Sequence, residues 1–244
     1  MSEIIAFTSG KGGTGKSTVC AGVGTALANS GKKVLIIELD FGFRCLDVFL
    51  AIKNEIKSDI FDYISEKCSA EECIIKTQTT PNLSLIPAPS HHIGEINPER
   101  IKKLIKEHEK QYDFILLDTG AGMQKEIIET LKICNNIVFV VTPDLISMRD
   151  ASKLSDEFYR YGCENQRLII NKVDKKYIEN GIVKNLDAVI TETGIQLLGV
   201  VPDDNELLLF YGLGKRLSYS SVGYTTFKAI AGRLRGENIP LAIL

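Results

Sequence analysis

One run of the sequence limits the fold more than any other: Gly10-Lys11-Gly12-Gly13-Thr14-Gly15-Lys16-Ser17, followed by Thr18. It fits the pattern G-x-x-x-x-G-K-[ST], directly after an apolar segment at 3–8 and at the start of a helical segment at 16–29. Glycines in such a loop let backbone N–H groups surround phosphate oxygens, and the helix N-terminus adds partial positive charge. We therefore expect residues 10–18 to bind a nucleotide, with Lys16 on the β- and γ-phosphates and Ser17 on Mg²⁺.

Short apolar segments alternate with longer amphipathic stretches along the whole chain. The expected strands are 3–8, 33–39, 83–87, 113–118, 136–142, 167–171 and 196–201. Besides the helix at 16–29, others are expected to begin near Asn97, Gln124, Ser147 and Tyr224. This alternation is typical of parallel strands joined by crossover helices. Because no repeat or linker divides the chain, the sequence predicts a single doubly wound α/β domain over 1–244, a mostly parallel sheet flanked by helices.

The composition excludes several classes of protein. The 244 residues are 44% hydrophobic, and 29 Lys and Arg against 31 Asp and Glu give a net charge of −2, so no global field attracts nucleic acid or anionic lipid. No apolar run approaches the ~18 residues of a membrane span, and the N-terminus lacks the basic region of a signal peptide. The six cysteines form no C-x-x-C pair, which fits a reducing compartment. We therefore expect a cytoplasmic protein.

Two of the expected strands end in a carboxylate. The second strand leads to Asp40, and the segment ending at Asp118 is followed by Thr119-Gly120-Ala121-Gly122. Carboxylates at the carboxyl ends of parallel strands lie where such sheets bind ligands. We expect Asp118 to hold Mg²⁺ with Ser17, while the glycines let the following segment respond to the γ-phosphate. The alternative for Asp40 is a capping role at a helix start.

A second lysine, Lys11, stands early in the loop, where a cradle of backbone N–H groups requires no charge. The sequence Lys11-Gly12-Gly13-x-Gly15-Lys16-Ser17-Thr18 resembles the deviant Walker A motif of the MinD/ParA family of dimeric ATPases. Residues 40–47 resemble the first switch of the MinD branch of that family. The resemblance extends from Ile4 to about Leu241, nearly the whole chain.

The resemblance implies a MinD-like molecular switch that dimerises with ATP and hydrolyses it slowly with Mg²⁺, under control of protein partners. Such a switch governs spatial positioning, for example placement of the division site or septum. Lys11 would reach across the dimer to the partner's phosphates, and Asp40 would orient the attacking water. The expected catalytic residues are therefore Lys11, Lys16 and Asp40, and the expected cofactors are ATP and Mg²⁺.

The expected strand at 167–171 ends in Asn171-Lys172-Val173-Asp174, where the base of the nucleotide is expected. In the resembling family an asparagine at the position of Asn171 binds adenine, yet Asn-Lys-x-Asp is also the guanine-reading motif of GTPases. The segment Gly199 to Asp204, with Pro202 and Asp203, resembles the MinD loop that closes over the base. This favours ATP, with GTP as the alternative.

The resemblance is weakest at the C-terminus. Thr226 to Arg235 is expected to form the last helix of the domain, which leaves a short tail at 237–244. Membrane-binding members of the MinD branch add an amphipathic helix there, but Pro240 and the short length oppose one here. This argues against autonomous membrane binding. The expected partners are a second copy of the chain and proteins of the MinC or MinE type, without a strong nucleic-acid signal.

Other functions stay open at this stage. A ParA-type partition ATPase would need a basic dimer surface, and only small groups such as Lys32-Lys33 and Lys102-Lys103 offer one. A flagellar-placement ATPase and a GTPase reading Asn171 to Asp174 are alternatives. A nucleotide-gated scaffold for metal-centre maturation is disfavoured by the missing cysteine pairs. His91 and His92 lack ligand spacing and are expected at the surface.

Overall fold

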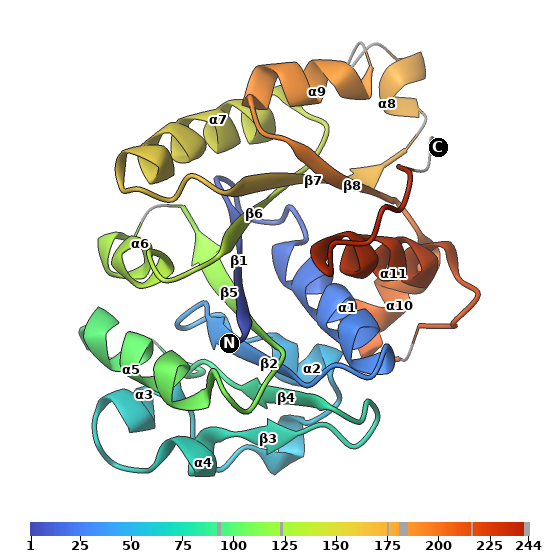
Figure 1. Cartoon of the computed structure of the whole chain (residues 1–244). Coiled ribbons are helices and arrows are strands. Elements are labelled where there is room, and N and C mark those ends of the chain that lie inside the picture. The colour runs from blue at the N-terminus through green and yellow to red at the C-terminus, as the bar shows by residue number, and fades with distance from the viewer. Residues whose placement is uncertain (92–93, 123, 175, 181–184, 216, 242–244) are drawn as a thin grey trace.

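The centre of the molecule is an eight-stranded sheet (Figure 1). The computed structural model describes residues 1–91, 94–122, 124–174, 176–180, 185–215 and 217–241. The strand order is β3-β4-β2-β5-β1-β6-β7-β8. The strands are β1 (Glu3–Ser9), β2 (Val34–Leu39), β3 (Ile75–Lys76), β4 (Leu83–Ile86), β5 (Phe114–Ala121), β6 (Asn136–Val141), β7 (Gln166–Val173) and β8 (Leu197–Pro202). The described pairs are parallel, apart from β3 against β4. The predicted doubly wound α/β fold is confirmed.

Helices cover both faces of this sheet (Figure 1). They are α1 (Lys16–Asn29), α2 (Leu46–Phe49), α3 (Ile60–Ile64), α4 (Ala70–Cys73), α5 (Pro98–His108), α6 (Lys125–Leu131), α7 (Leu145–Arg160), α8 (Lys176–Glu179), α9 (Leu186–Thr193), α10 (Asn205–Leu213) and α11 (Val222–Leu234), with a 3₁₀ turn at Lys53–Glu55. Side chains of α1, α2, α10 and α11 pack on one face, and side chains of α3 to α7 and α9 pack on the other.

The seven expected strands are present, with ends displaced by three residues at most. Two helix starts were placed too late in the sequence. Helix α7 begins at Leu145 rather than Ser147, because the Asp144 side chain accepts a hydrogen bond from the Ser147 amide and caps the helix. Helix α11 begins at Val222 rather than near Tyr224 or at Thr226, because Ser221 caps it in the same way. Strand β3, the short helices α2, α3, α4 and α8, and the longer helices α9 and α10 were not predicted.

Small residues on α1 set the position of the phosphate loop. A Cβ atom at Gly22 would overlap the ring of Phe227 on α11, and one at Gly24 would lie 2.9 Å from Ile36 of β2. The missing side chains let α1 lie close to both the sheet and α11. Because β1 is buried along its length and leads directly into the loop, the N-terminus of α1 is held rigidly at the carboxyl edge of the sheet.

The described part of the tail packs on the domain. The Arg233 guanidinium donates hydrogen bonds to the carbonyl oxygens of Ile239 at 2.9 Å, Pro240 at 2.6 Å and Leu198 at 2.9 Å. Residues 242–244 of the predicted tail lie outside the described residues, as does His92, whereas His91 is exposed as expected. Among the helices that the structure describes, none combines the length and apolar character needed to cross a membrane.

The close approach of α1 to α11 can be tested with Gly22→Ala. The added methyl group overlaps Phe227, so we expect the free energy of unfolding to fall by about 1–3 kcal/mol despite the better helix propensity of alanine. Gly212→Ala on α10 is the matched control, since nothing lies within 4 Å of its added Cβ atom, and it should raise stability by about 0.5–1 kcal/mol. Urea unfolding measures both values. Equal shifts in the two variants would contradict the packing argument.

Candidate nucleotide site

The loop between β1 and α1 has the backbone of a phosphate cradle. Gly13 and Gly15 adopt left-handed φ values of 80° and 85°, which side chains rarely tolerate. Gly15 is the N-cap residue of α1 and has no side chain with which to cap it, so the first N–H groups of the helix face the loop. A cavity of about 260 Å³ opens here, bordered by residues 12–18, Asp40 and Ala121. Its shape and donors fit phosphate groups.

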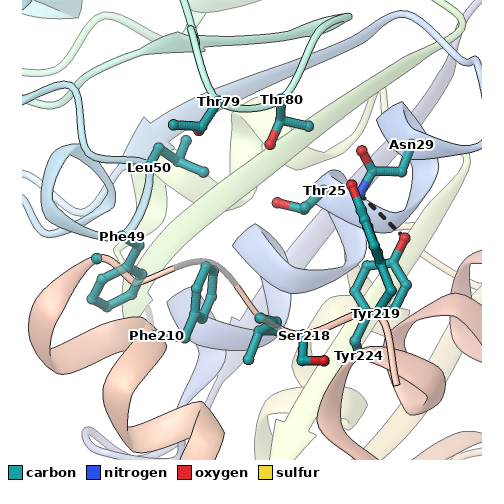
Figure 2. Close-up of a pocket in the computed structure, with 12 residues that line it drawn as sticks. Thr25, Asn29, Phe49, Leu50, Thr79, Thr80, Phe210, Ser218, Tyr219 and Tyr224 are labelled. Atoms are coloured by element: carbon teal, nitrogen blue, oxygen red, sulfur yellow. Dashed lines mark hydrogen bonds between the residues drawn. The ribbon is translucent and has the colours of Figure 1, made fainter. Parts of the chain in front are cut away.

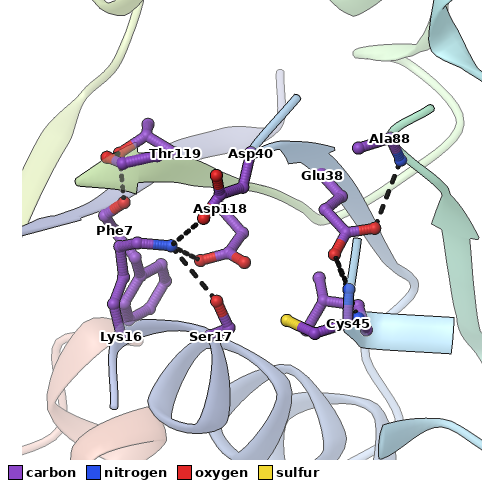
Figure 3. Close-up of polar contacts among 11 residues, drawn as sticks. Phe7, Lys16, Ser17, Glu38, Asp40, Cys45, Ala88, Asp118 and Thr119 are labelled. Carbon is purple, nitrogen blue, oxygen red and sulfur yellow. Dashed lines mark hydrogen bonds and ion pairs between the residues drawn. The ribbon is translucent and has the colours of Figure 1, made fainter. Parts of the chain in front are cut away.

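Lys16 is the buried cation of this cavity, with 6% of its side chain exposed. Its Nζ atom lies 2.8 Å from Asp118 Oδ1, 3.9 Å from Asp40 Oδ2 and 3.1 Å from Ser17 Oγ (Figure 3). Burial alone would lower the pKa of Lys16, but the charges of Asp118 and Asp40 outweigh it and the net shift is upward. Lys16 is therefore charged, and it holds together two carboxylates that would otherwise repel one another.

Asp118 and Ser17 fit a magnesium ion. Asp118 is fully buried, and its Oδ2 atom has no hydrogen-bond partner within the described chain. Buried, unpartnered carboxylate oxygens and hydroxyl oxygens are the hard ligands that Mg²⁺ prefers. Cys45 Sγ also lies within 4.8 Å of the Asp118 carboxylate, but a soft sulfur atom is a poor ligand for Mg²⁺. The oxygen donors are therefore the better ligand set.

Asp40 directly follows β2, and its carboxylate lies beside Gly120 near the end of β5. A Cβ atom at Gly120 would lie 3.3 Å from Asp40 Oδ1, so the glycine leaves the room that this carboxylate occupies. Burial raises the pKa of Asp40, although Lys16 opposes the shift. Three expected residues are thus brought together: Lys16 and Asp40 line the cavity, and the buried Asp118 is paired with Lys16 (Figure 3).

Lys11 lies apart from this group. Its Nζ atom is 3.4 Å from Asp144 Oδ1, with 41% of the lysine side chain exposed. The pKa of Asp144 is lowered: burial opposes the shift, but hydrogen bonds from the Thr142 hydroxyl and the Ser147 amide, with the charge of Lys11, outweigh it. In the single chain, Lys11 is therefore paired with the ionised N-cap of α7 and not with Asp40 or Asp118.

Asn171 occupies a place that sequence reasoning did not foresee. Its side-chain N–H group donates to the Thr14 carbonyl oxygen at 2.7 Å, and a Cβ atom at Gly15 would overlap it. Lys172, with a left-handed φ of 56°, donates from Nζ to the Gly13 carbonyl oxygen at 2.9 Å. Both residues fasten the phosphate loop to the end of β7. The Asn-Lys sequence was the available signal for these contacts, but the sequence analysis interprets it only as part of a base-binding motif.

The other predicted base-binding residues lie one strand further along the sheet. Pro202 of β8 pairs with Val173 of β7, and the Asp203 amide donates to the Val173 carbonyl oxygen at 3.0 Å. Neither is among the described residues that line the phosphate cavity. Asp174 accepts a hydrogen bond from the Lys176 amide at 3.0 Å at the start of α8.

Glu38 is a further residue of the site that sequence reasoning missed. This fully buried side chain of β2 accepts hydrogen bonds from the amides of Cys45 at 2.7 Å, Leu46 at 3.0 Å and Ala88 at 3.2 Å (Figure 3). It joins the segment after Asp40 to the end of β4. Burial raises the pKa of Glu38 to about 7, against the effect of these hydrogen bonds. A carboxylate within the apolar run Val34–Leu39 was the available signal.

A parallel sheet with β1 at its centre, a glycine-rich loop leading into α1 and a buried carboxylate on neighbouring β5 define a P-loop nucleoside triphosphatase. Residues 2–170 match the family described as an AAA domain. The chain is 30% identical over 249 residues to the septum site-determining protein MinD of Bacillus subtilis, covering 100% of this chain and 93% of that protein. The chain belongs to the MinD/ParA family of deviant Walker A P-loop ATPases.

Solved structures agree with this assignment. MinD in the MinC:MinD cell division complex of Aquifex aeolicus superposes with a TM-score of 0.91 at 31% identity, with 99% of each chain covered. MinD from Pyrococcus horikoshii, solved with Mg-ADP, superposes with a TM-score of 0.84 at 25% identity, with 96% of each chain covered. The architecture that holds the phosphate loop is therefore shared with these proteins.

The buried carboxylate of Glu38 should leave a trace in the pH dependence of stability. Its pKa is about 7 in the folded protein against an ordinary value of 4.5. The contribution of the protonated side chain to the free energy of unfolding is therefore complete below pH 4.5 and is lost as the pH rises through 7. In Mg²⁺-free protein, Glu38→Gln should therefore gain stability relative to the parent as the pH rises from 4.5 to 7. Urea unfolding at several pH values measures the difference. The exposed Glu164→Gln is the control, and parallel profiles for parent and Glu38→Gln would refute the assignment.

Proposed function

We propose that this protein is an ATP-driven switch that dimerises through its nucleotide face and hydrolyses ATP with one lysine supplied by the partner. The observation that carries the proposal is the division between the two lysines. Lys16 is buried against Asp118 and Asp40, while Lys11 is half exposed and paired with Asp144 at the surface. A surface ion pair of this kind contributes at most ~1 kcal/mol, so a phosphate can replace it.

The residues of the cavity divide the work of phosphoryl transfer. Lys16 would neutralise the β- and γ-oxygens, and residues 10–18 would donate backbone N–H groups to the phosphates. Ser17 and Asp118 would hold Mg²⁺, which supplies charge neutralisation between the phosphates. Asp40, next to Lys16 and with a raised pKa, is suited to orient the attacking water and accept its proton. Lys11 of the second copy would complete the charge around the transferred group.

Adenine is the base that we propose. The guanine-reading alternative would need the Asp174 carboxylate, which also accepts a hydrogen bond from the Lys176 amide at the start of α8, to accept hydrogen bonds from the base. Asn171 lies next to the phosphate loop, since its side-chain N–H group donates to the Thr14 carbonyl oxygen. Pro202 and Asp203 would border the base from β8. The Mg-ADP in the Pyrococcus horikoshii relative supports the same choice.

The cellular role that we propose is placement of the division site, through protein partners of the MinC or MinE type. The MinC:MinD complex of the Aquifex aeolicus relative supports a MinC-like partner. Residues 1–244 would act as one ATPase domain.

Complementation between two inactive variants tests the lysine supplied in trans. Lys11→Ala and Asp40→Ala should each abolish hydrolysis alone, whereas in a mixed dimer one site regains both residues. An equal mixture should recover about one quarter of the parent rate, since half of the dimers are mixed and each has one complete site. Steady-state phosphate release measures the rates. Lys33→Ala, an exposed lysine at the start of β2, is the control; a mixture no more active than its components would exclude action in trans.

The nucleotide dependence of dimerisation tests the base. Asp40→Ala should bind nucleotide without hydrolysing it and so retain any dimer that forms. Light scattering should give twice the monomer mass with Mg-ATP and the monomer mass with Mg-GTP. A dimer with Mg-GTP alone would transfer the base assignment to Asp174, and a monomer with both nucleotides bound would refute the dimer mechanism.

A further inference from the structure

A second cavity, separate from the phosphate loop, lies on the face of the sheet covered by α1, α2, α10 and α11 (Figure 2). Its volume is about 380 Å³, within the range of sites for small organic ligands. Its walls come from five parts of the fold: α1, α2, the segment before β4, the end of α10 with the following segment, and α11. Asn29, Ser218 and Tyr219 are exposed, so the cavity reaches solvent on this side.

The walls combine aromatic rings with uncharged polar groups. Phe49 and Phe210 lie at one end with ring centroids 6.1 Å apart, and Tyr219 and Tyr224 form an edge-to-face pair at 5.0 Å near the other (Figure 2). Asn29 donates to the Tyr224 hydroxyl at 3.2 Å. The described residues that line the cavity carry no charge. A site of this kind selects an uncharged, partly aromatic molecule, because an ion would lose its hydration without compensation.

Thr25 provides the feature that points to a ligand. Its hydroxyl oxygen is buried but has no hydrogen-bond partner within the described residues, and the side chain lies at the centre of the cavity wall in Figure 2. Burying a hydroxyl group without a partner costs about 1–3 kcal/mol. A carbonyl or hydroxyl group on a bound molecule would satisfy it.

Phe49 connects this cavity to the nucleotide site. Its side chain lines both cavities and contacts both Phe210 and Tyr211 of α10, the latter at 6.4 Å between ring centroids. Tyr211 also lines the phosphate cavity. Helix α2, which carries Phe49, begins at the amides held by Glu38. A molecule that repositions Phe49 would therefore act on the segment that follows Asp40.

We propose that this cavity is a regulatory site for a small uncharged molecule with an aromatic ring and one hydrogen-bonding oxygen, which bonds the Thr25 hydroxyl and stacks among Phe49, Phe210 and Tyr219. The link to nucleotide affinity rests on the proposed function of the phosphate loop. Binding of the molecule in the cavity does not rest on that function, so an experiment can refute the binding and the link to nucleotide affinity separately.

The test uses three uncharged probes, the naphthyl ketone prodan, 2-naphthol and acetophenone, with the full-length protein. Prodan fluorescence, and competition by the other two, should report one saturable site per chain. Thr25→Val keeps the shape and removes the hydroxyl, so it should weaken prodan binding about tenfold while raising the Tm of the free protein by about 2–4 °C. Ser218→Trp, at an exposed position on the wall, should abolish binding by filling the cavity.

Thr191→Val, an exposed threonine on α9, is the matched control and should leave prodan affinity unchanged. Absence of saturable binding by all three probes would overturn the site, as would prodan binding that both Thr25→Val and Ser218→Trp leave intact. Saturating prodan should change the Kd of Mg-ADP at least threefold, and Mg-ADP should change that of prodan by the same factor. An unchanged Mg-ADP affinity in protein that binds prodan would overturn the regulatory link.

Discussion

The ion pair between Lys16 and Asp118 is the interaction around which the rest of the molecule is arranged. The Lys16 side chain, of which 6% is exposed, tolerates the lost hydration of its ammonium group only because a carboxylate lies 2.8 Å away, with a second one at 3.9 Å. Holding these groups in place requires β1 and β5 to be neighbours and α1 to start at a fixed point. The buried β strands and the small residues of α1 supply that rigidity.

Much of this arrangement could be predicted from the sequence, because its parts have strong local patterns. The apolar runs that became the seven long strands are buried on both faces, so they read clearly against the amphipathic helices between them. Strand β3 has two residues, and helices α2, α4 and α8 have four each, too few for any periodicity to appear. Their positions depend on tertiary contacts, such as the hydrogen bonds from Cys45 and Leu46 to Glu38.

The site residues that sequence reasoning missed share one physical cause. Glu38 and Lys172 bind the backbone of distant segments, and such partners are set by the fold rather than by spacing along the chain. Asn171 is a related case: it was predicted to bind the base, and its side chain also donates a hydrogen bond to the Thr14 carbonyl oxygen. A buried amide that joins the loop to β7 also gives any base bound along that strand a direct connection to the phosphates. If the base binds beside Asn171 as proposed, its recognition would be coupled to the position of the loop.

The contrast between the two lysines explains how a rigid site can serve as a switch. Breaking the Lys16 pair would leave an uncompensated buried charge and would cost about 3–5 kcal/mol. The pair between Lys11 and Asp144 is partly solvated, with 41% and 31% of the side chains exposed, and exchanging it costs at most ~1 kcal/mol. A charge-assisted bond to phosphate readily compensates that loss. Asp144 also caps α7, so withdrawal of Lys11 leaves its carboxylate bonded to the Ser147 amide and the helix intact. The molecule can therefore change the partner of one lysine without disturbing the core that holds the other.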